Sequence, residues 1–324
     1  MENKIKVGFI FHKDNYFLLG NHFDNTYYNF FRKALKRNDR LIVKDFITED
    51  IFDCSSLKGE VDVILLWENS PFGMPKELQN IKKLDIPVIS RTGDPSRANS
   101  SKKLHEKWKI DYYFDFFSDS FFHKIYPKEF KYKKIFYGLE SSLFQNIKLF
   151  DERRKNKILN SGNIGNDKFF SKIINDIRNP RWNSYRCKVL RTKCSKLEYV
   201  DYRFTQDHDF TNDRYTLLLQ QYQSAIAADT YTPVQKYWEI PASGCLTFME
   251  ITKKNEGDHI NFKDNETAIF INEKNYEEKF LEYLNDNNNK KWKEIASAGR
   301  DFAMKNFNND LAVDELADLM EDLA

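Results

Sequence analysis

The stretch DTYTPVQKYWEIPASGCLTFME, Asp229–Glu250, combines the signals of a short helix with those of a buried strand. Thr232 and Gln235 have the spacing of a capping box, and Pro233 stands at the first helical position, so a helix is expected to begin there. Gly244 supplies the residue that ends a helix. The apolar run after it predicts a strand.

In the first half of the chain, apolar runs of strand length alternate with helix-length segments. We expect strands at Lys4–His12, Val61–Trp67 and Pro87–Asp94, and helices at Asn25–Arg37 and over KELQNIKKL, residues 76–84. The run VDVILLW is apolar at nearly every position, as expected of a strand buried on both faces. The alternation, completed by DYYFDFF and KKIFYG, predicts a parallel sheet with helices on both sides.

A charged stretch, DERRKNK at 151–157, is expected to link this unit to a second one, in which the pattern restarts. The sequence KILNSGNIG predicts a strand that ends in a glycine-containing loop. The remaining expected elements are a helix over DKFFSKIINDIRN, strands at CKVL and LEYVDYRF, a helix running into a strand over RYTLLLQQYQSAIAA, a strand at TAIFI and three closing helices.

Two such units predict an α/β protein with two Rossmann-like domains facing a cleft. The length of 324 residues agrees with two domains of roughly 150 residues each. We place the N-terminal domain at residues 1–152 and the C-terminal domain at 153–324, with the alternative that the last helix packs back on the N-terminal domain.

The composition, with 41% hydrophobic and 31% charged residues, is that of a globular protein. The net charge of only +2 gives no reason to expect a nucleic-acid partner. The lysine-rich stretch 102–157 predicts either a solvated face or a basic surface for a phosphate-bearing ligand or an anionic membrane, so peripheral membrane association stays open. The four cysteines lack the spacing of a metal site or a disulfide framework, which favours reduced thiols in a cytoplasmic protein.

Lys236 and Glu239 lie three residues apart on one face of the expected helix. The helix dipole disfavours a cation in the first turn by about 0.3–1 kcal/mol, which makes sense if an anion docks there. A carboxylate one turn further on can accept hydrogen bonds from both hydroxyls of a ribose. The pair therefore predicts either a nucleoside diphosphate site or an ordinary surface ion pair, and physics alone does not choose between them.

The sequence KYWEIPASGCLTF at 236–248 resembles the donor-binding segment of GT-B glycosyltransferases, and most of all the group 1 and CgeB-like (spore-maturation-protein-like) enzymes. The resemblance extends from about Lys155 to Phe307. It implies transfer of a sugar from a nucleotide-sugar donor, a UDP- or GDP-sugar, with no obligatory cofactor. It also implies that Glu239 holds the ribose and Lys236 the diphosphate. The other implied donor-binding residues are Ser161, Gly162 and Asn163 in the loop after the strand, and Ser243 and Gly244, which would let the backbone approach the donor.

Many retaining members of that family carry a second glutamate eight positions before the ribose-binding one. Tyr231 stands at that position in this chain, so the sequence leaves retention or inversion of configuration open. No DxD-like motif stands at a strand end, and no metal is expected to be obligatory.

Three residues of the N-terminal half are candidates for the group that deprotonates an acceptor hydroxyl. Asp94 follows an expected buried strand, at the edge where α/β sheets place ligands. His12 and His22 flank the loop after the first strand. For each, the alternative is structural: a turn-forming aspartate before a proline, or a histidine that serves only packing.

The resulting hypothesis is a glycosyltransferase that moves a sugar from a nucleotide sugar to the hydroxyl of a glycan or glycolipid acceptor. The alternatives are another chemistry on the same fold, such as a fucosyltransferase-like transfer with inversion or epimerisation of a nucleotide sugar, or a binding subunit without catalysis.

Overall fold

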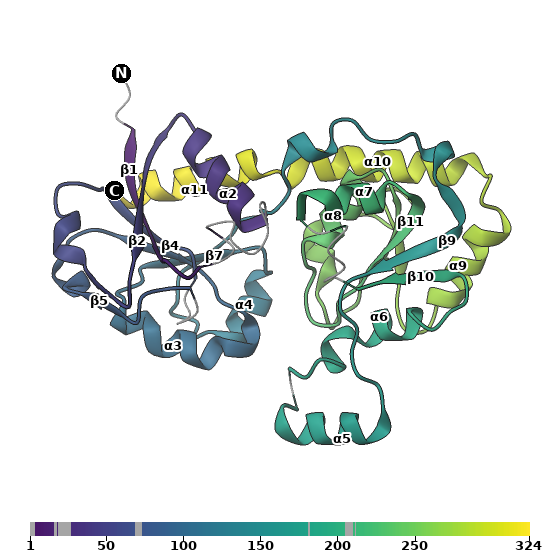
Figure 1. Ribbon diagram of the computed structural model, residues 1–324, viewed down its shortest axis with the longest axis horizontal. Helices are drawn as coiled ribbons and strands as arrows, with labels where there is room; N and C mark the ends of the chain where they lie inside the picture. The colour runs from purple at the N-terminus through teal and green to yellow at the C-terminus, as the bar shows by residue number, and fades with distance from the viewer. Residues whose placement is uncertain are drawn as a thin grey trace. The chain divides into compact units, whose positions relative to one another are not determined.

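A computed structural model describes residues 4–15, 18, 27–68, 73–180, 182–204, 210 and 212–324. The chain forms two compact units (Figure 1). Unit 1 comprises Met1–Gly138 and Asn308–Ala324, and unit 2 comprises Leu139–Phe307. The chain therefore passes from unit 1 to unit 2 after Gly138 and not at residue 152. The last helix belongs to unit 1.

The charged stretch at 151–157 is not a linker, because it forms the start of a strand of unit 2. Arg154 and Lys155 are exposed at the start of that strand and Lys157 is partly exposed, while Arg153 is buried. Arg153 donates hydrogen bonds from Nε and Nη2 to the carbonyl of Lys148. The run of charged residues therefore indicates the exposed beginning of a strand and not a boundary between domains.

Unit 1 is built on a six-stranded sheet in which every neighbouring pair is parallel, in the order β2-β1-β4-β6-β7-β8. A separate parallel pair joins β3 to β5. The strands are β1 (Ile5–His12), β2 (Leu41–Thr48), β3 (Ile51–Asp53), β4 (Val63–Leu66), β5 (Glu77–Gln79), β6 (Val88–Arg91), β7 (Tyr112–Asp115) and β8 (Tyr132–Lys134). The α-helices are α2 (Tyr27–Arg37), α3 (Ala98–Lys107), α4 (Asp119–Ile125) and α11 (Asn309–Leu323).

The core of unit 1 forms because β4 is buried at every position and α2 turns an apolar stripe toward the sheet. On α2 this stripe includes Phe31, Ala34 and Leu35, which share one face of the helix. The ring of Phe31 lies against Trp67, with 5.2 Å between ring centroids. Aromatic side chains therefore form a large part of this core.

Helix α11 is acidic, and it packs on α2, which ends in basic residues. Arg37 pairs with Asp310, and Arg40 pairs with both Asp318 and Glu321. The one-sided charge of the last helix therefore complements arginines of unit 1.

The prediction of a helix over KELQNIKKL is wrong, because residues 77–79 form β5 and Ile81–Lys83 form a 3₁₀ turn, η2. Leu78 and Ile81 are buried, a spacing that suits a helix as well as a strand followed by a turn. Asn80 adopts the left-handed conformation at φ 59°, which interrupts a helix. Pairing of β5 with β3 decides the outcome.

Unit 2 contains a five-stranded sheet, again with every neighbouring pair parallel, in the order β10-β9-β11-β12-β13. The strands are β9 (Arg154–Ser161), β10 (Val200–Arg203), β11 (Tyr222–Ala227), β12 (Leu246–Glu250) and β13 (Ile269–Ile271). The α-helices are α5 (Phe169–Arg178), α6 (Val189–Cys194), α7 (Tyr215–Leu219), α8 (Lys236–Ala242), α9 (Tyr276–Asn285) and α10 (Lys290–Asn306). Both units are thus parallel α/β structures, which confirms the predicted fold class.

Two local predictions in unit 2 are wrong. The segment CKVL, predicted as a strand, forms the end of a 3₁₀ turn, η6 (Arg186–Lys188), and the start of α6. Leu190 and Cys194, one helical turn apart, enter the core of unit 2, and four residues were too few to reveal that period. Helix α8 begins at Lys236 and not at Pro233, and its N-cap residue, Gln235, makes no side-chain capping bond.

In the part of the chain that the structure describes, no helix is both long and apolar enough to cross a membrane.

Candidate functional site

The candidate site lies at the carboxyl edge of the sheet of unit 2, where β9, β11 and β12 end side by side. Open parallel sheets place ligands at this edge. Ser161 is the last residue of β9, Asp229 follows β11 closely, and Glu250 is the last residue of β12. Lys236 reaches this edge from the first position of α8.

The loop after β9 is shaped around Lys236. The Lys236 ammonium donates a hydrogen bond to the carbonyl of Ser161. Gly162 has φ +108°, a conformation that favours glycine, and a Cβ atom there would collide with the Nζ atom of Lys236. The same Cβ position lies 3.3 Å from Nη1 of Arg191. A glycine at 162 therefore lets two cations approach the backbone at one point.

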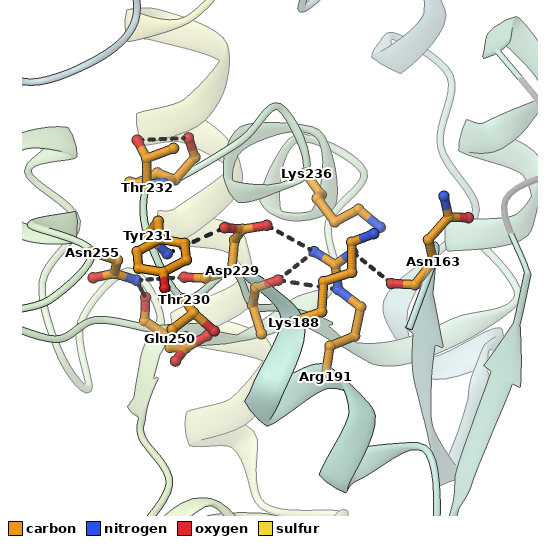
Figure 2. A network of polar contacts seen from close by, with 12 residues as sticks. Asn163, Lys188, Arg191, Asp229, Thr230, Tyr231, Thr232, Lys236, Glu250 and Asn255 are labelled. Atoms are coloured by element: carbon orange, nitrogen blue, oxygen red, sulfur yellow. Dashed lines mark hydrogen bonds and ion pairs between the residues drawn. The ribbon is translucent and has the colours of Figure 1, made fainter. Parts of the chain in front are cut away.

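Arg191 is the second cation of the site, and the sequence analysis missed it. Its Nη1 donates to the carbonyl of Asn163 at 3.1 Å, and its Nε donates to the carbonyl of Ala228 at 3.1 Å. Its Nη2 lies 3.8 Å from the carboxylate of Asp229. In Figure 2, Lys188, Arg191 and Lys236 gather beside Asn163. Lys188 and Arg191 are three residues apart, the spacing of neighbours on one face of a helix. This pattern was not recognised because a strand was predicted over residues 187–190.

The ammonium of Lys236 is destabilised where it lies. Burial lowers its pKa well below the usual value for lysine, and the nearby Arg191 cation lowers it further. Glu239 and Asp229 oppose this shift. A bound anion would relieve the repulsion between the two cations, so the arrangement fits an anionic ligand.

Glu239 lies one turn along α8 from Lys236. Its carboxylate accepts no hydrogen bond from any side chain or backbone group among the described residues, and its side chain is only partly exposed. Burial raises the pKa of Glu239 to about 7, against the opposing charge of Lys236. Near it, the hydroxyls of Ser161 and Tyr215 are hydrogen-bonded at 2.6 Å. Glu239 is therefore an acceptor group available to a ligand.

Ser243 and Gly244 lie at the opposite end of α8 from Lys236. Ser243 is buried, and its hydroxyl donates to the carbonyl of Ile240 at 2.6 Å. Gly244 ends the helix with φ +75°, and a Cβ there would lie 2.7 Å from Ile147 and 3.2 Å from Arg153. Protein atoms, rather than an open donor site, surround this pair. The structure thus brings Ser161, Gly162, Asn163 and Lys236 together but gives Ser243 and Gly244 a packing role.

The acceptor-side candidates lie in unit 1. His12 ends β1, and its Nε2 is 3.5 Å from the carboxylate of Asp50. Asp94 follows β6 and is exposed, and its carboxylate accepts a hydrogen bond from the backbone N–H of Ser96 at 2.8 Å. Because β4 separates β1 from β6, the two strand ends are about 10 Å apart, so His12 and Asp94 do not form a pair. His22 lies outside the described residues.

Among the described residues, no group of three or more His, Cys, Asp and Glu side chains could hold a metal ion.

No family model and no curated protein sequence matches the chain. In structure, it is similar to HepE of Anabaena in complex with UDP and glucose, with a TM-score of 0.60 and 10% identity over 98% of this chain and 99% of that one. A glycosyltransferase from Rickettsia africae has a TM-score of 0.57 and 10% identity over 99% of both chains. An α-glucosyltransferase in complex with UDP-glucose and DNA containing an abasic site has a TM-score of 0.57 and 10% identity over 98% of this chain and 100% of that one. The chain therefore has the fold of the GT-B glycosyltransferases.

Proposed function

We propose that the protein is a glycosyltransferase of the group 1 or CgeB-like type, which uses a UDP-sugar as donor and binds it in unit 2. The observation that carries this proposal is the approach of Lys236 and Arg191 to Gly162 at the carboxyl end of β9. Two of the structurally similar proteins are complexes with UDP or UDP-glucose, which favours uridine over guanosine in the donor.

In this proposal the residues of the site divide the donor between them. Lys236 and Arg191 neutralise the diphosphate, and Glu239 accepts hydrogen bonds from the ribose hydroxyls. As the bond between the sugar and the diphosphate breaks, negative charge grows on the departing diphosphate. The two cations, already held in place, stabilise that charge without reorganisation.

The acceptor is proposed to be a hydroxyl of a glycan or glycolipid, with Asp94 or His12 as the base that removes its proton. Asp94→Asn keeps the hydrogen bond from the N–H of Ser96 but removes the basic carboxylate. His12→Gln removes the basic imidazole. The base should be the residue whose variant loses transfer while UDP affinity is retained. If both variants transfer sugar normally, neither residue is the base.

A thermal-shift screen tests the proposed function directly. UDP at 100 times its dissociation constant should add about 2.7 kcal/mol to the free energy of unfolding, with GDP and ADP at the same concentrations giving smaller shifts. Release of free sugar or UDP from the stabilising UDP-sugar, measured with and without glycan acceptors, then separates an enzyme from a binding subunit. No stabilisation by any nucleoside diphosphate would refute the donor site.

The affinity for uridine is expected to fall about tenfold from pH 8 to pH 6, because the pKa of Glu239 lies near 7. The ionised carboxylate accepts from both ribose hydroxyls, so binding strengthens as the pH rises through that value. Uridine carries no phosphate, which leaves Lys236 out of the measurement. Titration calorimetry at several pH values gives the profile.

Two controls assign that pH dependence. Burial also raises the pKa of Glu250, to about 8, so Glu239→Gln must give a flat profile if Glu239 is responsible. The analogue 2′,3′-dideoxyuridine, which lacks both ribose hydroxyls, should bind weakly and without pH dependence. A profile that persists in the Glu239→Gln variant would remove Glu239 from the ribose site.

A further inference from the structure

Helix α5 of unit 2 presents its apolar residues to solvent. Five large apolar side chains are exposed along its ten residues: Phe169 at 71%, Phe170 at 77%, Ile173 at 44%, Ile174 at 47% and Ile177 at 77%. No residue of the helix is buried. Figure 1 shows α5 set apart from the sheet of unit 2, between two long connections.

The polar side of α5 is the side that holds it to the protein. The ammonium of Lys172 lies 4.0 Å from the centroid of the Tyr185 ring. The carboxylate of Asp176 accepts hydrogen bonds at 2.7 Å from Asn183 and from Arg186. A helix at the surface of a globular protein usually packs its apolar stripe against the core and exposes its polar side. The orientation of α5 is therefore that of a helix whose apolar face has another partner.

The size of this face points the same way. At about 200 Å² for each large side chain, the five exposed fractions amount to roughly 600 Å² of apolar surface. That is at the upper limit of the largest patch on an ordinary monomer, and such patches mark sites of interaction. Isolated exposed residues such as Ile51 or Leu149 do not form a comparable stripe within one helix.

The charges around the apolar face favour an anionic surface as the partner. Lys168 and Arg178 are exposed at the two ends of α5. The two acidic residues of the segment, Asp167 and Asp176, are each paired with a basic side chain of unit 2. Two copies of the protein joined through this face would bring like charges together, whereas anionic lipid headgroups would neutralise them.

We propose that α5 is a membrane-docking helix, which inserts its five apolar side chains at the boundary between headgroups and acyl chains of an anionic bilayer, while Lys168 and Arg178 contact the headgroups. Interfacial helices bind in this way, by an apolar face that includes aromatic residues and by basic residues beside it. The attachment is peripheral, and it involves none of the residues proposed to bind the donor.

Vesicle co-sedimentation of the full chain tests the proposal. Vesicles of phosphatidylcholine with about one third phosphatidylglycerol should bind the protein at least tenfold more tightly than vesicles of phosphatidylcholine alone. The double variant Phe170→Ser/Ile177→Ser should lose at least tenfold of that affinity. Lys168→Glu/Arg178→Glu should lose the preference for anionic vesicles. Because these side chains are exposed, the variants should keep the thermal stability and the UDP affinity of the original protein.

Ile51→Ser is the matched control, because Ile51 is 58% exposed in unit 1 and lies outside α5. It should bind vesicles normally. Absence of vesicle binding, or binding that the Phe170→Ser/Ile177→Ser variant retains, would overturn the proposal. A concentration-dependent dimer that this variant dissociates, without vesicle binding, would instead identify a second copy as the partner and likewise overturn it.

Discussion

Replacing Lys236 by methionine is expected to lower the rate of sugar transfer by about 10²–10³-fold, the usual cost of removing one preorganised group that stabilises developing negative charge. Methionine keeps the apolar part of the side chain and removes the ammonium. The affinity for UDP should fall as well, whereas the affinity for uridine should stay within about a factor of two at a pH where Glu239 is ionised in both proteins. The charge acts on the diphosphate, which uridine lacks.

The same substitution should leave the ligand-free protein as stable as before, or more stable. Burial and the neighbouring Arg191 already lower the pKa of Lys236, which means that its charged form is costly in the absence of a ligand. The lost hydrogen bond to the carbonyl of Ser161 offsets part of this gain. Thermal unfolding without nucleotide measures the balance.

Lys193→Met is the matched control, because Lys193 lies on α6, is partly exposed and pairs with Glu273 instead of reaching the loop after β9. Its variant should transfer sugar at the normal rate. Equal losses of uridine and UDP affinity in the Lys236→Met variant would show that Lys236 holds the loop in place and does not act on phosphate.

Asp115→Ala is expected to cost about 3–5 kcal/mol of unfolding free energy, because it removes the common acceptor of a buried network and leaves Arg91 with Glu68 as its remaining ion-pair partner. The Asp115 carboxylate lies at the carboxyl end of β7 and is fully buried. It accepts hydrogen bonds from the hydroxyl of Tyr137 at 2.9 Å, from the N–H of Phe116 at 2.9 Å and from the hydroxyl of Thr92. Nη1 of Arg91 lies 3.4 Å away, and Arg91 is buried too.

Chemical denaturation followed by tryptophan fluorescence measures this loss. One of the five tryptophans, Trp67, lies beside the network, with its ring centroid 5.1 Å from the guanidinium carbon of Arg91. Asp310→Ala removes a surface ion pair with Arg37 in the same unit and should cost at most about 1 kcal/mol. A loss of similar size for the two variants would mean that the buried carboxylate contributes no more than a surface one. Since the proposed donor site lies in unit 2, the folded Asp115→Ala protein should still bind UDP.

The proposed donor site combines residues that the sequence reveals with residues that it does not. Lys236 and Glu239 could be identified from the sequence, because their spacing on one helix face is a local property. The loop of Ser161, Gly162 and Asn163 could be identified only through its resemblance to a family. The same resemblance also indicated Ser243 and Gly244, which the structure surrounds with protein atoms.

By itself, the sequence determined most strands of the two sheets but not β2, β3 or β5, and it also predicted a strand at CKVL that does not form. Strand β4, for example, is apolar at every position, and its burial on both faces could be predicted from that run alone. Only the tertiary structure decided that Arg191 joins Lys236, because the carbonyls that hold its guanidinium follow two different strands, β9 and β11. It also decided which side of α5 faces the protein, since that depends on Tyr185 and Arg186, outside the helix. The periodicity of apolar residues indicates which side chains share one face of a helix or strand. What packs on that face depends on contacts between segments that are distant in the sequence.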